Sequence, residues 1–152
     1  MSAHAESQVP QDRQSRASGP ALINELRAAH SVLRERIKEL GELTERAAAS
    51  RLECTSARLR LSQASIERRA VLKRIWESLS GRADAAGSAV LTRVRAADGE
   101  LIAHSIEHLG TWTSAAVAAD WHGYCEASQS MREHMLRIVA AEAELLRPLL
   151  SR

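Results

Sequence analysis

The segment from Thr111 to Leu150 constrains the fold most, because it carries one helical period of apolar and small residues. Asp120 is a favoured helix N-cap, and after it such residues recur three and four positions apart, which is the spacing of one helix face. Glu142 is the exception on it, since a buried carboxylate costs free energy unless another group pairs with it. The face carries Tyr124, Ser128, Met131, Met135, Ile138, Glu142, Leu146 and Leu149.

The composition predicts an all-α protein. Of the 152 residues 45% are hydrophobic, phenylalanine is absent, and only seven glycines and three prolines are available to end helices. Such a chain, rich in Ala, Leu, Arg and Glu, favours helices. Its length predicts one core and one domain. The formal charge of +2 indicates neither nucleic acid nor an acidic membrane as a partner.

The N-terminal segment Met1 to Gly19 is polar, rich in Ser and Gln, and shows no apolar period. We therefore expect a disordered tail, followed by a helical domain from Pro20 to Leu150. Pro20 suits the first helical position after Ser18 or Gly19, and a helical period begins there. His30 lies inside the apolar face of this helix, which carries Leu22, Leu26, His30, Leu33, Ile37 and Leu40.

Two further helices follow. The capping box formed by Ser50 and Glu53 predicts the start of a helix that ends near Leu79. Its inward face carries Cys54, Leu61, Ser65, Arg68, Leu72, Ile75 and Leu79. The next helix is predicted from Ala89 to His108, and its inward face carries Leu91, Val94, Asp98, Ile102, Ser105 and Leu109. Arg68 and Asp98 are thus charged residues that face a core.

The four helices each place one polar residue at a similar depth. In an up-down-up-down four-helix bundle with short loops, His30, Arg68, Asp98 and Glu142 would share one layer. We expect Arg68 to form charge-assisted hydrogen bonds with the carboxylates of Asp98 and Glu142, with His30 alongside. In an alternative interpretation the Arg68 side chain extends to the surface, and Asp98 pairs there with Arg93 or Arg95.

The sequence resembles the hemerythrin-like (HHE cation-binding) family from Pro20 to Leu150. The residues that carry the resemblance are Trp112, the AADW segment at 118–121, Tyr124 and the segment RIVAAEAELLRPLL at 137–150. The resemblance implies a four-helix bundle whose interior holds a non-haem di-iron centre. The family places a histidine on its first helix, His-x-x-x-Glu on its second, histidine or carboxylate ligands on its third, and His-x-x-x-Glu or a similar pattern on its fourth.

The chain departs from this ligand pattern. His30 matches the ligand of the first helix and Glu142 the carboxylate of the fourth, while Asp98 could occupy a position on the third. The second helix carries Arg68 and Leu72 where the resemblance implies histidine and glutamate, and Ile138 stands at the histidine position of the fourth helix. Because a guanidinium repels a metal cation, we expect a degenerate site without a cofactor.

Three functions are compatible with these features. The first, which we favour, is a non-catalytic interaction or regulatory module with another protein as a partner. The second is a di-iron protein that binds or senses oxygen, nitric oxide or iron through His30, Asp98, Glu142 and His134. The third, a nucleic-acid binder, is disfavoured because the arginines are not interleaved with aromatic residues. No phosphate loop, nucleophile elbow or Cys-His pair indicates an enzyme.

The remaining motifs receive simple interpretations. His104 and His108 have the spacing of helical metal ligands, but without an acidic or thiol partner we expect them on a solvated flank. Cys54 and Cys125 lack metal-ligand spacing and are interpreted as reduced thiols near the core. Trp112, Trp121 and Tyr124 are expected to close the end of the bundle between the third and fourth helices, and Met131 and Met135 to fill its core. No signal-peptide core or membrane span is evident, so we expect a cytoplasmic protein.

Overall fold

The computed structural model describes residues 18–152, and this part of the chain is helical throughout apart from its short connections. The predicted all-α class is therefore confirmed for these residues. Four long helices and one short helix occur in the order α1 (Gly19–Thr44), α2 (Arg51–Leu79), α3 (Ala85–Thr111), α4 (Ser114–Ala119) and α5 (Trp121–Leu150). Residues 1–17, hence most of the predicted tail, lie outside the described residues.

Side-chain caps determine where the helices begin. Ser18 accepts a hydrogen bond from the backbone N–H of Ala21, so α1 starts at Gly19, the last residue of the predicted tail. Ser50 caps α2 by accepting from the N–H of Glu53 at 3.0 Å. The Glu53 carboxylate binds Arg46 instead of completing the capping box. The caps of α3, α4 and α5 are Asp84, Thr113 and Asp120.

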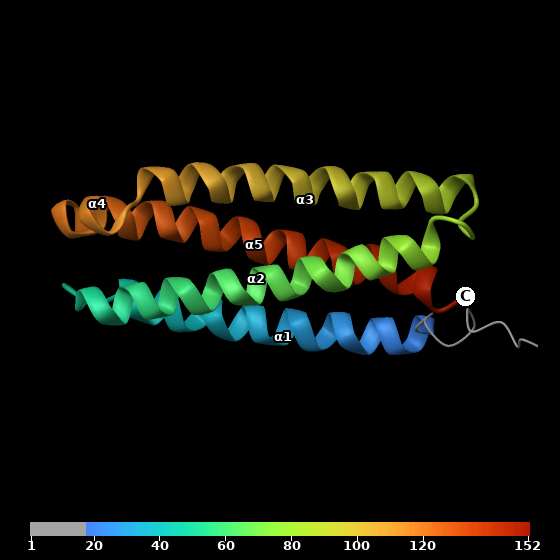
Figure 1. Cartoon of the computed structure of the whole chain (residues 1–152), viewed down its shortest axis with the longest axis horizontal. Coiled ribbons are helices and arrows are strands. Elements are labelled where there is room, and N and C mark those ends of the chain that lie inside the picture. Colours follow the sequence, from blue (N-terminus) through green and yellow to red (C-terminus); the bar gives the residue numbers. More distant parts are fainter. Residues whose placement is uncertain (1–17) are drawn as a thin grey trace, which may run out of the picture.

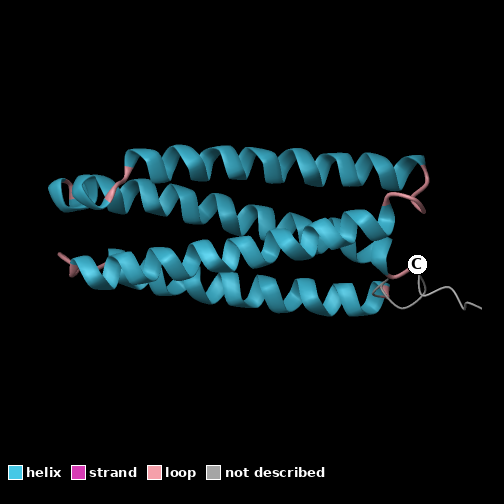
Figure 2. Ribbon diagram, viewed as in Figure 1, coloured by secondary structure: helices cyan, strands magenta, loops and turns pink. Residues whose placement is uncertain are grey.

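The four long helices lie side by side and alternate in direction along the chain (Figure 1). Helix α1 packs against α2 and α5, and α3 packs against α5, whereas α2 and α3 approach each other much less closely. The connections are short, and α4 occupies the one between α3 and α5 (Figure 2). No helix within residues 18–152 combines the length and the hydropathy needed to cross a membrane.

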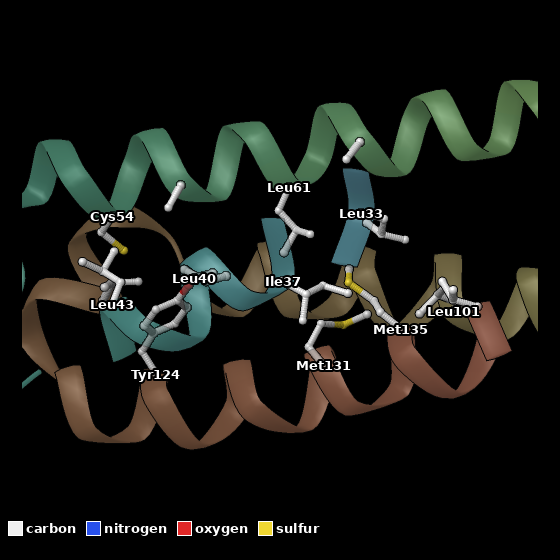
Figure 3. Packing of buried hydrophobic residues seen from close by; sticks show 14 residues of the cluster. Leu33, Ile37, Leu40, Leu43, Cys54, Leu61, Leu101, Tyr124, Met131 and Met135 are labelled. Carbon is white, nitrogen blue, oxygen red and sulfur yellow. The ribbon is translucent and has the colours of Figure 1, made fainter. Parts of the chain in front are cut away.

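Two clusters of buried apolar side chains fill the interior. One lies toward α4 and contains Leu33, Ile37, Leu40, Leu61, Tyr124, Met131 and Met135 among others (Figure 3). The second lies toward the opposite end and contains Leu22, Leu26, Leu72, Ile75, Val94, Leu146 and Leu150 among others. Met131 and Met135 therefore belong to the core, as predicted.

The predicted face of α1 is confirmed at every position, but the faces of the other helices were wrong at some. In α5 Val139 and Leu150 are buried in place of Ile138 and Leu149, which are half-buried. In α2 Ala64 is buried in place of Ser65, and in α3 Leu101 in place of Ile102. In α3 the predicted Ser105 is half-buried and Leu109 is exposed. Helix α3 also starts four residues earlier than predicted, at Ala85, and continues through Gly110 to Thr111.

The end of the helices near α4 is closed by aromatic side chains, as predicted. The ring of Tyr124 lies 5.8 Å from that of Trp112 and 5.7 Å from that of Trp121. The indole N–H of Trp121 donates to the backbone carbonyl of Arg46 at 3.1 Å. These contacts connect the start of α5 to the loop after α1 and thereby hold this end of the molecule together.

Candidate functional site: a buried charged layer

Each long helix contributes one polar side chain to a layer in the interior. These are His30 from α1, Arg68 from α2, Asp98 from α3 and Glu142 from α5, with exposed fractions of 2%, 1%, 5% and 2%. The structure thus brings together all four residues selected from the sequence. The Arg68 side chain does not extend to the surface, and the alternative pairing of Asp98 with Arg93 or Arg95 does not occur.

The guanidinium of Arg68 connects the layer. Its Nη1 donates to Oε1 of Glu142 at 2.6 Å, and its Nη2 donates to Oδ1 of Asp98 at 2.6 Å. The second oxygen of Glu142, Oε2, lies 2.9 Å from Nε2 of His30. Because an ionised carboxylate only accepts hydrogen bonds, the N–H of the His30 ring is assigned to Nε2. One chain of hydrogen bonds therefore links all four long helices.

The layer separates the two apolar clusters. On α2, Ala64 belongs to the cluster near α4, Leu72 belongs to the other, and Arg68 lies between them. On α5, Glu142 likewise lies between Val139 and Leu146. The charged groups are consequently surrounded by apolar side chains on both sides, where hydrogen bonds to charged groups are strong and unpaired charges are costly.

Among the groups of the layer, burial has its clearest effect on the pKa of Asp98. The pKa of Asp98 is raised above its ordinary value, chiefly because burial disfavours the carboxylate. The Arg68 guanidinium acts in the opposite direction, and the Glu142 carboxylate adds to the rise in this pKa. The Nε–H of Arg68 is buried and has no hydrogen-bond partner among the described residues. Arg68 is thus the arginine that pairs with both carboxylates of the layer.

The acids of the layer are occupied by the guanidinium. An oxygen of each carboxylate already accepts from the guanidinium, whose cationic group lies between the two acids. Within residues 18–152 no three His, Cys, Asp or Glu side chains are placed to share an ion. His134, the fourth ligand of the di-iron interpretation, lies elsewhere, because its Nδ1 is 2.8 Å from Nδ1 of His104.

Histidines on the α3–α5 flank form a second polar group. His104 pairs with His134 on α5, and His108 packs near the Tyr124 ring with a centroid separation of 6.0 Å. Burial lowers the pKa of His108 to about 4, and the positive charge of Arg58 lowers it further. Burial also lowers the pKa of His134, with the neighbouring His104 acting in the same direction. No sequence pattern indicates the pair between His104 and His134, because it depends on how α3 and α5 are rotated.

Neither cysteine forms a disulfide. Cys54 is buried in the apolar cluster near α4 and Cys125 is half-buried on α5. Burial raises the pKa of both thiols, so neither side chain has the thiolate character of a reactive cysteine.

The chain was compared with known proteins in three ways. No family model matches it, and neither the curated proteins nor the solved structures include a significant match.

Proposed function

We propose that this chain is a hemerythrin-like, up-down-up-down four-helix bundle that has lost its di-iron centre and acts as a non-catalytic interaction or regulatory module. The observation that carries the proposal is the position of the Arg68 guanidinium, which donates to Glu142 on one side and to Asp98 on the other. The hemerythrin-like origin is supported by the ligand-type residues at matching positions, His30 and Glu142, which are hydrogen-bonded to each other.

The charge of Arg68 opposes a metal in the layer. A divalent ion about 4 Å from a guanidinium would meet roughly 8 kcal/mol of repulsion at an effective dielectric constant of about 20. Displacing the side chain would leave its own cation without the two carboxylates that now accept from it. Arg68 therefore provides the positive charge that a metal would otherwise supply to these acids.

A non-catalytic role is supported by the burial of the layer. Its four polar side chains are almost fully buried between two apolar clusters. Of the four, His30 borders a surface pocket, and that pocket, of about 20 Å³, is too small for an organic substrate. A role in contacting another protein is supported by large apolar side chains exposed on α2 and α3: Leu52, Leu59, Ile66, Ile106 and Leu109. Such side chains can contribute apolar area to an interface.

The experiment is elemental analysis of protein purified after expression with added iron. We expect the native chain to contain essentially no iron, whereas a stoichiometric di-iron centre with oxo-bridged absorption would establish the alternative, a working oxygen, nitric oxide or iron protein. The double variant Arg68→His/Leu72→Glu restores the second-helix ligands that the resemblance implies. It is expected to take up more iron than the native chain does. Arg74→Met, which removes an exposed arginine paired with Glu25, is the matched control.

A further inference from the structure

A cavity lies between α2 and α3, which pack less closely against each other than α1 packs against α2. Its volume is about 210 Å³, and its floor is formed by α5 and a side chain of α1. Leu61 lines it from α2, His108 from α3, and Tyr124, Met131 and Met135 from α5. Met131 and Met135 point from α5 toward the interior in Figure 3, with Leu61 across from them on α2. The cavity therefore has an apolar floor and an opening between two helices.

The charges around the cavity have one sign. Arg58, Arg69 and Arg132 line it, and no aspartate or glutamate does. None of these arginines forms an ion pair within residues 18–152, and their hydrogen bonds go to backbone carbonyls and hydroxyl groups. His108 adds no positive charge near neutral pH, because burial lowers its pKa to about 4. The lining thus contains three arginines and no acid, and the guanidinium of Arg132 is turned toward Thr44 on α1.

A buried polar atom adds a second feature. Tyr124 is fully buried and lines the cavity, and its hydroxyl group lies beside the side chains of Ser128 and Cys54 without good hydrogen-bond geometry to either. Burial raises the pKa of this hydroxyl to about 12, so it is a neutral donor at physiological pH. Arg58 lies over the same ring, 5.3 Å from its centroid.

We propose that the cavity between α2 and α3 binds a small aromatic carboxylate. The carboxylate would accept hydrogen bonds from the arginines, and the ring would pack on the methionines and the rings of Tyr124 and His108. An engineered cavity of about 150 Å³ holds benzene, so the present cavity has room for a ring with a short acidic side chain. This site is separate from the charged layer, and the proposal is independent of whether the layer excludes metals.

Isothermal titration calorimetry of the native chain with trans-cinnamate tests the proposal without any substitution. Cinnamamide is the matched ligand, because it keeps the ring and the size but has no charge. We expect saturable binding of cinnamate and affinity for cinnamamide that is weaker by about tenfold or more. Equal affinities for the two ligands, or no binding of cinnamate up to its solubility limit, would overturn the proposal.

Variants locate the site. Ser65→Phe introduces a ring at the cavity wall and is expected to abolish cinnamate binding. Arg58→Met and Arg69→Met each remove one guanidinium and are expected to weaken it by about tenfold. Arg93→Met changes an exposed arginine of α3 outside the cavity and should bind like the native chain. Circular dichroism checks that each variant is folded. Native affinity in a folded Ser65→Phe variant would place cinnamate elsewhere and contradict the proposal.

Discussion

Arg68 is the most deeply buried charged side chain in the described part of the protein. It lies on α2 and donates hydrogen bonds to Asp98 on α3 and Glu142 on α5, so it connects three helices. A buried ionic group of this kind adds little net stability compared with apolar residues, but removing one member leaves the others unpaired. The layer is therefore expected to respond very differently to single and to combined substitutions.

Replacing Arg68 alone should be strongly destabilising. The variant Arg68→Met keeps most of the side-chain volume but leaves Asp98 and Glu142 buried without their cation. We expect the free energy of unfolding to fall by about 3–5 kcal/mol, measured by urea denaturation. The control Arg74→Met breaks an exposed pair with Glu25 and should cost about 0–1 kcal/mol. Equal effects of the two substitutions would contradict the role of Arg68 as the cation of the layer.

His108 should make stability depend on pH. Its pKa is lowered from 6.5 to about 4 by burial first and by Arg58 second, so below pH 6.5 the unfolded chain binds a proton that the folded chain does not. Stability is therefore lost as the pH falls from about 6.5 to about 4. Allowing for the partial exposure of the ring, we expect this loss to be on the order of 1–2 kcal/mol.

The variant His108→Gln should lack this part of the pH dependence. Its free energy of unfolding, measured by urea denaturation between pH 7 and pH 4, is expected to decline less than that of the native chain. The pKa of Asp98 is raised, so its contribution to stability changes with pH in the opposite direction to that of His108. Asp98 is present in both proteins, and the difference between their curves therefore reports His108. Parallel curves for His108→Gln and the native chain would be inconsistent with a buried neutral imidazole.

At the scale of elements, two glycines within helices differ in what an added Cβ atom would contact. Gly123 lies in the first turn of α5, where a Cβ atom would come within 2.3 Å of the Asp120 carboxylate that caps the helix. Gly99 lies within α3 with no atom near its Cβ position. Gly99→Ala should therefore stabilise the protein by about 0.5–1 kcal/mol, because alanine favours the helix. Gly123→Ala should destabilise it by about 1 kcal/mol through loss of the cap.

Thermal unfolding followed by circular dichroism distinguishes the two glycine variants. The melting temperature should rise for Gly99→Ala and fall for Gly123→Ala. A rise of similar size for both would mean that helix propensity outweighs the cap of α5, and that the contact between Asp120 and the N–H of Gly123 at 2.9 Å contributes little.

Much of the element structure could be predicted from the sequence. The inward face of α1 was predicted correctly because its leucines, Ile37 and His30 recur at the period of one helix face. On α3 and α5 some residues predicted to be buried were wrong by one position. Adjacent residues there, such as Ile138 and Val139, are both apolar, so either one fits the helical period. Helix α4 was not predicted, because six residues are too few to show a period.

The four residues of the site could be predicted because each is the one charged residue or histidine on an otherwise apolar or small-residue face. To predict that they contact one another, we also needed the position of each residue along its helix. That position follows from the helix lengths and the short loops of a four-helix bundle. The pair of His104 and His134 could not be found this way, since both lie on flanks whose rotation the apolar period determines only approximately. For the same reason, the sequence could not show that His134 lies outside the layer.

At the scale of the whole molecule, the charged layer divides one interior into two apolar clusters. Replacing all four members with apolar residues of similar size should join these clusters without leaving an unpaired charge. For the variant His30→Leu/Arg68→Met/Asp98→Leu/Glu142→Met we expect stability equal to or greater than that of the native chain, by up to about 1–4 kcal/mol.

Differential scanning calorimetry of this fourfold variant beside Arg68→Met measures the contrast. The single variant should melt well below the native chain, and the fourfold variant at or above the native temperature. If the fourfold variant also melted far below the native chain, the layer would contribute more net stability than we infer for a buried ion network.

In the function proposed for this chain, the Arg68 guanidinium occupies the place of a metal ion and excludes metals from the layer. The most direct test is anomalous X-ray diffraction from crystals of the native chain grown with excess ferrous iron. We predict no anomalous peak within the layer and an Arg68 side chain hydrogen-bonded to both Asp98 and Glu142, as in the present structure. An iron peak coordinated by His30 and Glu142, with the Arg68 side chain displaced, would contradict the proposal.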